Sequence, residues 1–229
     1  MTKYVEFLKK VPIFAKLSDA ALAEISGTVT PVRFARNAVV FSQGEPGDAM
    51  YVVLVGRVKV VLYSESGREV ILAQLGPVDC VGEMAIIAEQ PRSASVIALE
   101  DVTLLRLTRG DFVARVRANP DIALSLLTVL VQRLAEADEK IGDLALVDVY
   151  GRVARFLLKL AREKGKPAEG GTIIEDRPTH QEIANIVGTA RETVSRAISD
   201  FMRQGLLRIE GKTMILLEEA RLAAVFESA

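Results

Sequence analysis

The sequence has few of the residues that bind metals or form covalent links. It contains one cysteine, Cys80, one histidine, His180, and no tryptophan. A single cysteine excludes a disulfide within the chain, and so few soft ligands argue against a haem, zinc or iron–sulfur centre. We therefore expect no metal, no haem and no iron–sulfur cluster, and we expect Cys80 to be a small residue of a hydrophobic core.

Long hydrophobic runs and an excess of one charge are also absent. The most hydrophobic stretch, residues 122–131, is far shorter than the ~20 residues that cross a membrane. The N-terminal segment alternates charged and hydrophobic residues, unlike a signal peptide. Lys and Arg number 29 and Asp and Glu 30, for a net charge of −1. We expect a cytoplasmic protein with no membrane partner, in which any DNA affinity comes from a local basic surface.

The first half of the chain changes from a helical pattern to a strand pattern. Residues 3–30 have the hydrophobic spacing of helices, with Ser18 and Asp19 placed to cap the second of them. Short runs rich in Val, Ile, Leu and Tyr follow up to residue 107, separated by turn signals such as residues 44–48. Many short strands predict a small β-sandwich or barrel. The predicted strands are 39–41, 51–55, 58–63, 70–75, 95–99 and 103–107.

A long helix is predicted from residue 120 to about residue 147. Hydrophobic residues recur along it at alternating steps of four and three, which is a heptad pattern. These residues are Ala123, Leu127, Leu130, Leu134, Ala137, Ile141 and Leu144. Gly142 weakens the helix by about 1 kcal/mol. The pattern favours a helix that pairs with a second copy over one that packs only on its own domain.

The C-terminal part has the pattern of a winged helix-turn-helix. We expect an amphipathic helix over 151–162, a loop to residue 171, a strand at 172–175, helices at 179–187 and 190–204, and two strands around 210–212. Thr179 and Glu182 have the spacing of a capping box at the start of the first motif helix. Gly188 permits the tight turn between the two motif helices.

The second motif helix displays charged side chains suited to reading DNA. At 100° per residue, Arg191, Glu192 and Arg196 lie within an arc of about 140°. Arginine pairs with O6 and N7 of guanine, and glutamate accepts from N4 of cytosine. The alternative is a solvated face with a Glu192–Arg196 ion pair. His180 and Lys212 are candidates for phosphate contacts, with plain surface residues as the alternative.

A second motif, GEMAIIAEQPRSASV at 82–96, lies between predicted strands. Gly82 permits close backbone approach, and residues 83–88 form one helical turn whose free N–H groups attract an anion. Arg92 is suited to fork onto phosphate oxygens, and Ser93 adds a hydroxyl. Glu83 is suited to accept from a sugar hydroxyl. The alternative is a surface salt bridge.

Over nearly its full length, the chain resembles the cyclic AMP receptor protein (CRP/FNR) family of bacterial transcription regulators. The resemblance rests on the motif at 82–96, on NPDI from Asn119, on Asp148-Val149, and on QEIANIVGTARETVSRAI at 181–198. It implies an α+β protein with a jelly-roll-like β-roll that binds a cyclic nucleotide (1–120), a dimerisation helix and hinge (121–148), and a winged helix-turn-helix (149–229).

The resemblance also implies a function and partners. A homodimer would bind double-stranded DNA at a pseudo-palindrome with TGTGA-like half-sites, in response to cyclic AMP and in contact with RNA polymerase. No enzyme activity is expected. Residues matching Gly82, Glu83, Arg92 and Ser93 bind phosphate and ribose in the family, and those matching Arg191, Glu192 and Arg196 read bases. A nucleotide-binding protein without DNA regulation, and a regulator independent of ligand, remain as alternatives.

The candidate sites extend beyond these residues. The ligand-binding set is Leu72, Val81, Gly82, Glu83, Met84, Arg92, Ser93, Ala94, Arg133, Ala137 and Asp138. The DNA-binding set is Thr179, His180, Gln181, Ala190, Arg191, Glu192, Thr193, Arg196 and Lys212.

One pair of residues departs from the family pattern. Cyclic AMP sensors of the family often carry Thr and then Ser or Asn, which contact adenine, where this chain has Ala137 and Asp138. Asp138 could accept from N6 of adenine, which favours cyclic AMP, or from N1–H and N2–H of guanine, which favours cyclic GMP. A solvated surface aspartate is the third alternative. Cyclic AMP leads by resemblance, with cyclic GMP as the alternative ligand.

Overall fold

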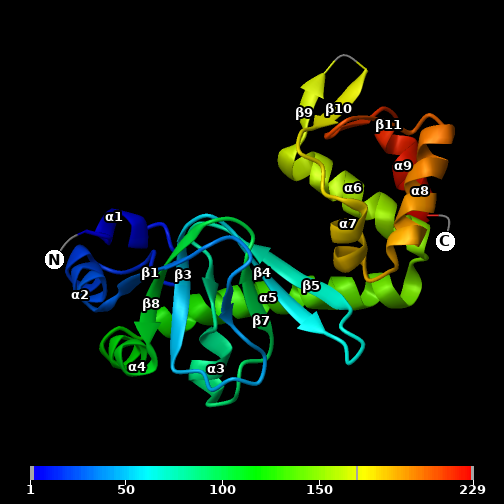
Figure 1. The fold of residues 1–229 in the computed structure, drawn as a ribbon. Coiled ribbons are helices and arrows are strands. Elements are labelled where there is room, and N and C mark those ends of the chain that lie inside the picture. Colours follow the sequence, from blue (N-terminus) through cyan, green and yellow to red (C-terminus); the bar gives the residue numbers. More distant parts are fainter. Residues whose placement is uncertain (1–2, 169, 228–229) are drawn as a thin grey trace. The chain divides into compact units, whose positions relative to one another are not determined.

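The computed structural model describes residues 3–168 and 170–227, without the side chains of residues 226 and 227. The chain forms two compact units, one up to Leu134 and one from Ala135 onward (Figure 1). The first unit contains two β-sheets with helices. The second contains the end of a long helix followed by a winged helical domain.

The first unit contains two antiparallel four-stranded sheets, which agrees with the predicted sandwich. The first sheet has the order β1 (Thr30–Phe34), β8 (Val102–Thr108), β3 (Ala49–Val55), β6 (Cys80–Val81). The second has the order β2 (Val39–Phe41), β7 (Ser95–Ala98), β4 (Val58–Tyr63), β5 (Glu69–Leu75). All six predicted strands are confirmed, with small shifts at their ends. Two strands were not predicted: β1, which contains Pro31, and the very short β6.

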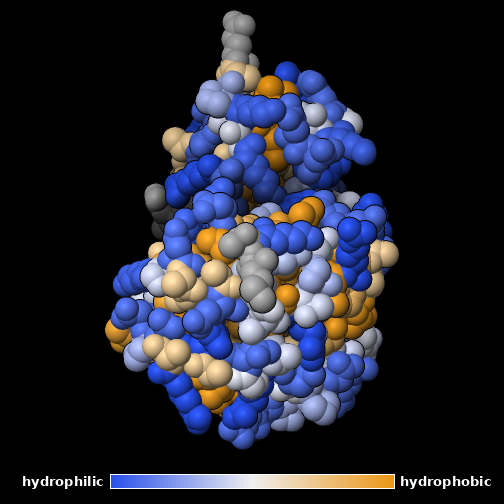
Figure 2. All heavy atoms as spheres, turned by 90° about the vertical axis from the view of Figure 1, so that its left-hand side faces the viewer, coloured by the Kyte–Doolittle hydropathy of each residue, from blue (hydrophilic) through white to orange (hydrophobic). Residues whose placement is uncertain are grey.

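Strand β3 of the first sheet is buried on both of its faces over most of its length, and strand periodicity explains how. On β3, Val53 points into the core between the sheets, whereas Met50 and Val52 belong to a core shared with the helices. Successive residues of a strand face opposite sides of the sheet, so one strand serves both cores. Cys80 lies in the helix-side core with 4% of its surface exposed, as expected. On the face shown in Figure 2, hydrophobic residues form small groups separated by hydrophilic ones.

Besides the long helix described below, four helices pack on the first unit's sheets. They are α1 (Val5–Leu8), α2 (Asp19–Thr28), α3 (Glu83–Ala88) and α4 (Arg109–Ala118). The Ser18 hydroxyl accepts from the amide of Ala21, so the predicted cap of α2 is confirmed. The predicted turn at 83–88 is confirmed as α3. Helix α4 was not predicted because it buries a single side chain, Phe112, and so has almost no hydrophobic period.

The long helix α5 (Asp121–Leu146) is confirmed, but the predicted heptad positions need a correction. Leu130 packs against the helix-side core of the first unit instead of facing outward. The exposed stripe uses Leu124 and Val131, which are 59% and 63% exposed, in place of Ala123 and Leu130. The other exposed members are Leu127, Leu134, Ile141 and Leu144. The helix therefore needs hydrophobic residues on two faces, and sequence spacing alone does not tell the two faces apart.

The second unit is a winged helix-turn-helix. Its elements are α6 (Val149–Lys164), β9 (Lys166–Ala168), β10 (Gly171–Ile174), α7 (His180–Val187), α8 (Arg191–Arg203), β11 (Leu207–Glu210), β12 (Thr213–Leu216) and α9 (Glu219–Glu227). The sheet has the order β11-β12-β10-β9. The prediction of a loop over 166–168 was wrong, because these residues pair with β10 as an edge strand that tolerates Pro167. Helix α9 was also not predicted.

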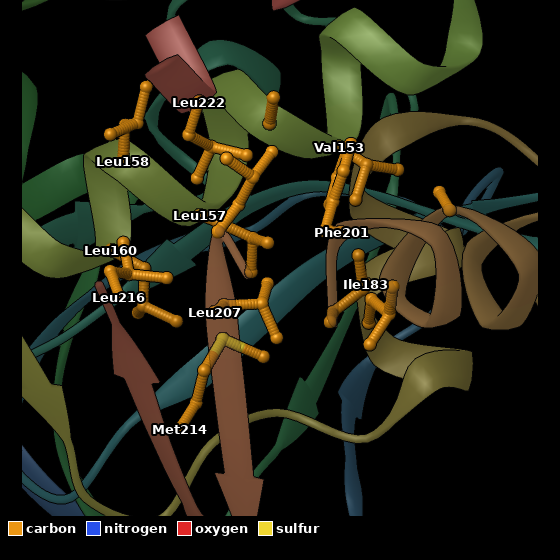
Figure 3. Packing of buried hydrophobic residues seen from close by; sticks show 14 of the residues in the cluster. Val153, Leu157, Leu158, Leu160, Ile183, Phe201, Leu207, Met214, Leu216 and Leu222 are labelled. Atoms are coloured by element: carbon orange, nitrogen blue, oxygen red, sulfur yellow. The ribbon is translucent and has the colours of Figure 1, made fainter. Parts of the chain in front are cut away.

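Hydrophobic residues from every helix of the winged domain meet in one core. Figure 3 shows Leu157 of α6, Ile183 of α7 and Phe201 of α8 directed toward the same interior. Residues of the wing strands and of α9 complete this core: Leu207, Met214, Leu216 and Leu222. The core fixes the angle between α7 and α8, and therefore the outward face of α8.

The end of α5 is tied to the helix-turn-helix within this unit. The Asp148 carboxylate caps α6 by accepting from the amide of Gly151 at 2.7 Å. Arg152 donates to the carbonyls of Val147 at 2.7 Å and Val187 at 3.2 Å, which joins the end of α5 to the end of α7. Asp143 and Arg155 form an ion pair between α5 and α6.

Replacing either of two glycines of the second unit by alanine should change the free energy of unfolding, in opposite directions at the two positions. Gly188 has φ +74°, and an added Cβ would lie 3.1 Å from Cδ2 of Leu144. We expect Gly188→Ala to lower the free energy of unfolding by about 1–2 kcal/mol. Gly142 lies within α5 with nothing within 4 Å of an added Cβ, so Gly142→Ala should raise it by about 1 kcal/mol. Urea unfolding at one protein concentration measures both, and equal stabilities would contradict the left-handed turn at Gly188.

Candidate functional site

The motif at 82–96 forms a connection between β6 and β7 that includes α3. Gly82 follows β6 with φ +84°, a backbone conformation that glycine adopts without steric cost. An added Cβ there would lie 2.5 Å from Nη1 of Arg92. Both the backbone angle and the close approach of the guanidinium therefore require glycine at this position.

Arg92 is a buried cation, with 4% of its surface exposed. Its Nη1 donates to the carbonyl of Gly82 at 2.9 Å, and its Nη2 donates to the carbonyl of Ala49 at 2.7 Å. The guanidinium lies over the ring of Phe41, 4.2 Å from the ring centroid. Burial lowers the pKa of Arg92, but a guanidinium stays charged in proteins. Its Nε is buried and has no hydrogen-bond partner within the described chain.

Glu83 is a buried anion at the start of α3, with 2% of its surface exposed. Its Oε1 accepts from Nη1 of Arg133 at 2.8 Å, and Nη2 of Arg133 also donates to the carbonyl of Cys80 at 2.5 Å. Within the described residues, Oε2 of Glu83 is buried without a partner. An unsatisfied carboxylate oxygen in the interior is costly, which marks Glu83 as a side chain with a free acceptor.

These features fit a cyclic nucleotide. The buried guanidinium of Arg92 has an unused Nε–H, and its two hydrogen-bond acceptors are neutral carbonyl oxygens. An anionic phosphate oxygen is a stronger acceptor for a guanidinium than a neutral carbonyl. The free Oε2 of Glu83 suits a ribose hydroxyl. The glycine lets the backbone approach closely. Arg92 would hold the phosphate, and Glu83, oriented by Arg133, would hold the sugar.

The other predicted ligand residues have different environments. Met84 and Leu72 are 55% and 39% exposed, and Ser93 is exposed with its hydroxyl 4.0 Å from the Met84 sulfur. Val81 and Ala94 are buried, with 5% and 6% of their surface exposed, and a contact of either with a ligand stays a prediction. Ala137 and Asp138 are exposed residues of α5 that belong to the second compact unit. Their contact with a nucleotide stays a prediction.

The first helix of the DNA-reading motif begins and ends as its sequence predicts. Thr179 accepts from the amide of Glu182 at 3.2 Å, and the Glu182 carboxylate accepts from the amide of Thr179 at 2.8 Å. The capping box is therefore confirmed. Gly188 ends α7 in the left-handed conformation, as the tight turn requires. On the exposed side of α7, Gln181 donates to Asn185 at 2.8 Å.

The predicted base-reading residues are exposed at the start of α8. Arg191, Glu192 and Arg196 form no ion pair in the part of the chain that the structure describes. Arg196 instead lies 3.4 Å from the Thr193 hydroxyl. Ala190, the exposed N-cap of α8, has no side chain that could compete for the helix N–H groups. The predicted alternative of a Glu192–Arg196 pair is not seen.

A hollow lies between the wing tip and the segment before α7. It is lined by Asp176, Arg177, Thr179, Gly211 and Lys212. The amide of Arg177 donates to the carbonyl of Lys212 at 2.9 Å, so the loop and the wing are held together. Next to this hollow in sequence, Nδ1 of His180 forms a 2.7 Å hydrogen bond with the hydroxyl of Ser195 on α8.

Sequence reasoning missed several residues around these sites. Phe41 and Ala49 contact Arg92 from β2 and β3, and no local pattern links them to the motif. Ser195 and Arg177 surround His180. Arg177 had a weak signal, because a basic residue just before a capped helix is well placed for phosphate.

The described residues contain neither a cluster of metal ligands nor a membrane-spanning helix. No cluster of three or more His, Cys, Asp or Glu side chains suited to a metal ion occurs among them. None of the helices in the same residues combines the length and the hydrophobicity needed to cross a membrane.

Two family models match the chain. Residues 31–119 match the model of the cyclic nucleotide-binding domain, and residues 151–225 match the Crp-like helix-turn-helix domain. The first match contains the motif at 82–96, and the second contains α7, α8 and the wing.

Known proteins resemble the chain over most of its length. The chain is 36% identical over 218 residues to a CRP-like cAMP-activated global transcriptional regulator of Mycobacterium tuberculosis, which covers 95% of this chain and 97% of the relative. It is 36% identical over 222 residues to the cyclic AMP receptor protein of Thermus thermophilus, with 95% and 98% covered. The structure of the c-di-GMP responsive global regulator CLP of Xanthomonas campestris matches with a TM-score of 0.78 at 26% identity, covering 87% and 99%. These relatives are regulators and not enzymes.

Cys80, beside the Glu83–Arg133 pair, should be almost unreactive in the folded protein. Burial, followed by the negative charge of Glu83, raises the pKa of its thiol from 9.0 to about 12. Near pH 8, the thiolate fraction should fall about a thousandfold relative to the unfolded chain, and labelling by a thiol reagent should slow accordingly. The stabilisation from the neutral thiol is complete below pH 9 and disappears as the pH rises toward 12. Unfolded protein, which has one thiol per chain, is the control, and equally rapid labelling of both forms would contradict the burial.

Proposed function

The chain belongs to the CRP/FNR family of transcription regulators, and from this we propose that it is a homodimer that binds cyclic AMP and, in response, a pseudo-palindromic DNA operator. One observation carries the proposal. A single chain combines a buried arginine and a buried carboxylate, each with an unused hydrogen-bonding atom, with an exposed and unpaired Arg191, Glu192 and Arg196. The first set suits an anionic nucleotide, and the second suits base edges.

We assign three functional parts to the chain. Residues 1–120 bind the nucleotide, 121–148 form the dimerisation helix and hinge, and 149–229 bind DNA. The protein works in the cytoplasm, and RNA polymerase is the expected partner at promoters.

The phosphate of the ligand contacts Arg92 and the hydroxyl of Ser93. Glu83 accepts from the ribose hydroxyl, and Arg133 positions Glu83. A relative named as cAMP-activated, 36% identical to this chain, supports cyclic AMP as the ligand.

The exposed hydrophobic stripe of α5 supports a dimer. Leu127, Val131 and Leu134 are 56%, 63% and 61% exposed, and large exposed hydrophobic patches mark association surfaces. Continuing the same steps of four and three from Leu134 leads to Asp138 and then to Ile141. An aspartate within a dimer interface opposes association, because burying its charge costs the free energy of its hydration. A donor on the nucleotide base would offset that cost, so the ligand would favour the paired form.

The base of the ligand remains open between two chemistries. Asp138 accepts one bond from N6 of adenine, or two from N1–H and N2–H of guanine. The second arrangement matches both carboxylate oxygens and makes cyclic GMP the second candidate ligand. Ala137 lacks the hydroxyl that the family's adenine contact uses, which weakens the case for adenine without affecting the phosphate pocket.

The operator follows from the symmetry of the dimer. Two recognition helices related by a two-fold axis enter successive major grooves about one DNA turn apart. Each half-site should be TGTGA-like, with the arginines on guanines and Glu192 on a cytosine. Thr179, Gln181 and Lys212, all exposed, contact phosphates.

Nucleotide should increase DNA affinity through Arg92. The binding of a labelled operator duplex is measured while cyclic AMP, or in a second series cyclic GMP, is titrated into wild-type protein, Arg92→Ala and the control Arg57→Ala. Arg57 is an exposed arginine of the same domain. We expect Arg92→Ala to need about a hundredfold more nucleotide or to show no response, because a buried phosphate loses a charge-assisted partner. Arg57→Ala should behave like wild type. If neither cyclic AMP nor cyclic GMP changes wild-type DNA binding, the proposed switch is wrong.

The same titration with Asp138→Ala tests which base the site accepts. A loss of response to cyclic GMP alone would assign cyclic GMP as ligand, and a loss of response to cyclic AMP alone would assign cyclic AMP. Unchanged responses to both would make Asp138 a solvated surface residue.

Glu192 should determine one base pair of each half-site. Sites selected from random DNA should form a pseudo-palindrome, and Glu192→Ala should reduce discrimination at one position by about 1–3 kcal/mol. Glu163→Ala, which changes an exposed glutamate on α6, is the control. An asymmetric consensus, or unchanged discrimination in Glu192→Ala, would contradict the assigned docking.

A further inference from the structure

The chain's single histidine lies where the two motif helices meet. His180 is the first residue of α7, and its Nδ1 is 2.7 Å from the hydroxyl of Ser195 on α8. Its other ring nitrogen, Nε2, is buried, and no described residue offers it a hydrogen-bond partner. The ring is therefore satisfied at one nitrogen only.

Positive charge surrounds this ring. Arg177 lies in the loop before α7 and Arg191 at the start of α8, and Lys212 shares the neighbouring hollow with Arg177. Acidic residues also lie on the loop before α7, on α7 and on α8. The Glu182 carboxylate accepts hydrogen bonds from the amide and the hydroxyl of Thr179, both at 2.8 Å. Asp176 lines the hollow. Glu192, on α8, is exposed and directed to solvent.

This environment disfavours the charged imidazolium. A protonated ring has two N–H donors, and the donor at Nε2 would have no acceptor. Burial, followed by the charges of Arg177 and Arg191, lowers the pKa of His180 below 6.5. The free protein therefore holds His180 neutral at physiological pH.

DNA would reverse this balance. Arg177, Thr179, Arg191 and Lys212 all lie on the surface that the proposed function turns toward DNA. Phosphates attracted there bring negative charge that offsets the charges of Arg177 and Arg191, which lowers the electrostatic cost of protonating the ring. DNA therefore stabilises the charged form of His180, whereas the free protein destabilises it.

We propose that DNA binding by this protein takes up a proton at His180, so that DNA affinity rises as the pH falls. The proposal rests on the proposed DNA binding and adds a pH dependence that belongs to this histidine. The pKa of His180 is higher in the complex than in the free protein. The added affinity is therefore complete below the free pKa and is lost as the pH rises through the pKa of the complex. Between the two values, a dimer takes up as many as two protons.

A direct test uses the fact that the chain has one histidine. Wild-type protein labelled at histidine gives the NMR signals of a single imidazole ring. These signals are titrated with pH in the free protein and in the presence of a duplex of two TGTGA-like half-sites and saturating cyclic AMP. A third titration with cyclic AMP and no DNA isolates the effect of the duplex. We expect DNA to raise the pKa of His180 by about one unit, equivalent to tenfold in affinity per protomer. An unchanged or lower pKa in the complex would overturn the proposal, and this measurement needs no variant.

The second test is the pH dependence of affinity. Kd for the same duplex is measured from about pH 5.5 to 8 at constant ionic strength, because DNA affinity depends strongly on salt. Wild-type affinity should rise at least about tenfold across this range as the pH falls. His180→Gln keeps an amide able to bond Ser195 but cannot be protonated, so its profile should be flat. The α-amino group titrates equally in both proteins and cancels in the comparison.

The possible outcomes distinguish a failure of the proton linkage from a failure of the proposed DNA binding. If wild-type protein fails to bind the duplex at every pH, the proposed function fails and the proton linkage with it. If wild type binds but shows the same profile as His180→Gln, DNA binding stands and the proton linkage is overturned.

Discussion

The buried ion pair between Glu83 and Arg133 is the interaction on which the nucleotide-binding unit depends. A carboxylate with only 2% of its surface exposed must have a charged partner, and Arg133 of α5 supplies it at 2.8 Å. The same guanidinium holds the carbonyl of Cys80, at the end of the strand that leads into the motif. One side chain of α5 therefore fixes both the start of the motif and its acidic residue.

Helix α5 is consequently constrained on two faces. Its inner face carries Arg133 and Leu130 against the β-domain, and its outer face carries the exposed hydrophobic stripe. Within the second unit, the end of the same helix is joined to α7 through Arg152. Under the proposed function, the same helix would serve the ligand site, the dimer interface and the DNA-binding motif, and an element that several sites can bias is what coupling between sites requires.

Much of the fold was predictable because it depends on neighbours in sequence. The capping box at Thr179, the left-handed turn at Gly188 and strand β4 follow from spacings of a few residues, and the structure confirms each of them. Helix α4 and strand β9 were missed because one has almost no hydrophobic period and the other is a polar edge strand. The stripe on α5 was displaced because Leu130 packs on its own domain.

The sequence by itself determined the family, the order of the elements, and the residue types of both sites, since these are carried by contiguous motifs. Tertiary structure alone decided what those residues contact. Arg92 lies over Phe41 and bonds to Ala49, 43 positions away, because the β-sandwich brings distant strands together. His180 meets Ser195 only because a shared hydrophobic core sets the angle between α7 and α8. Burial, and with it the free acceptor of Glu83 and the lowered pKa of His180, depends on packing from the whole domain, which no local spacing encodes.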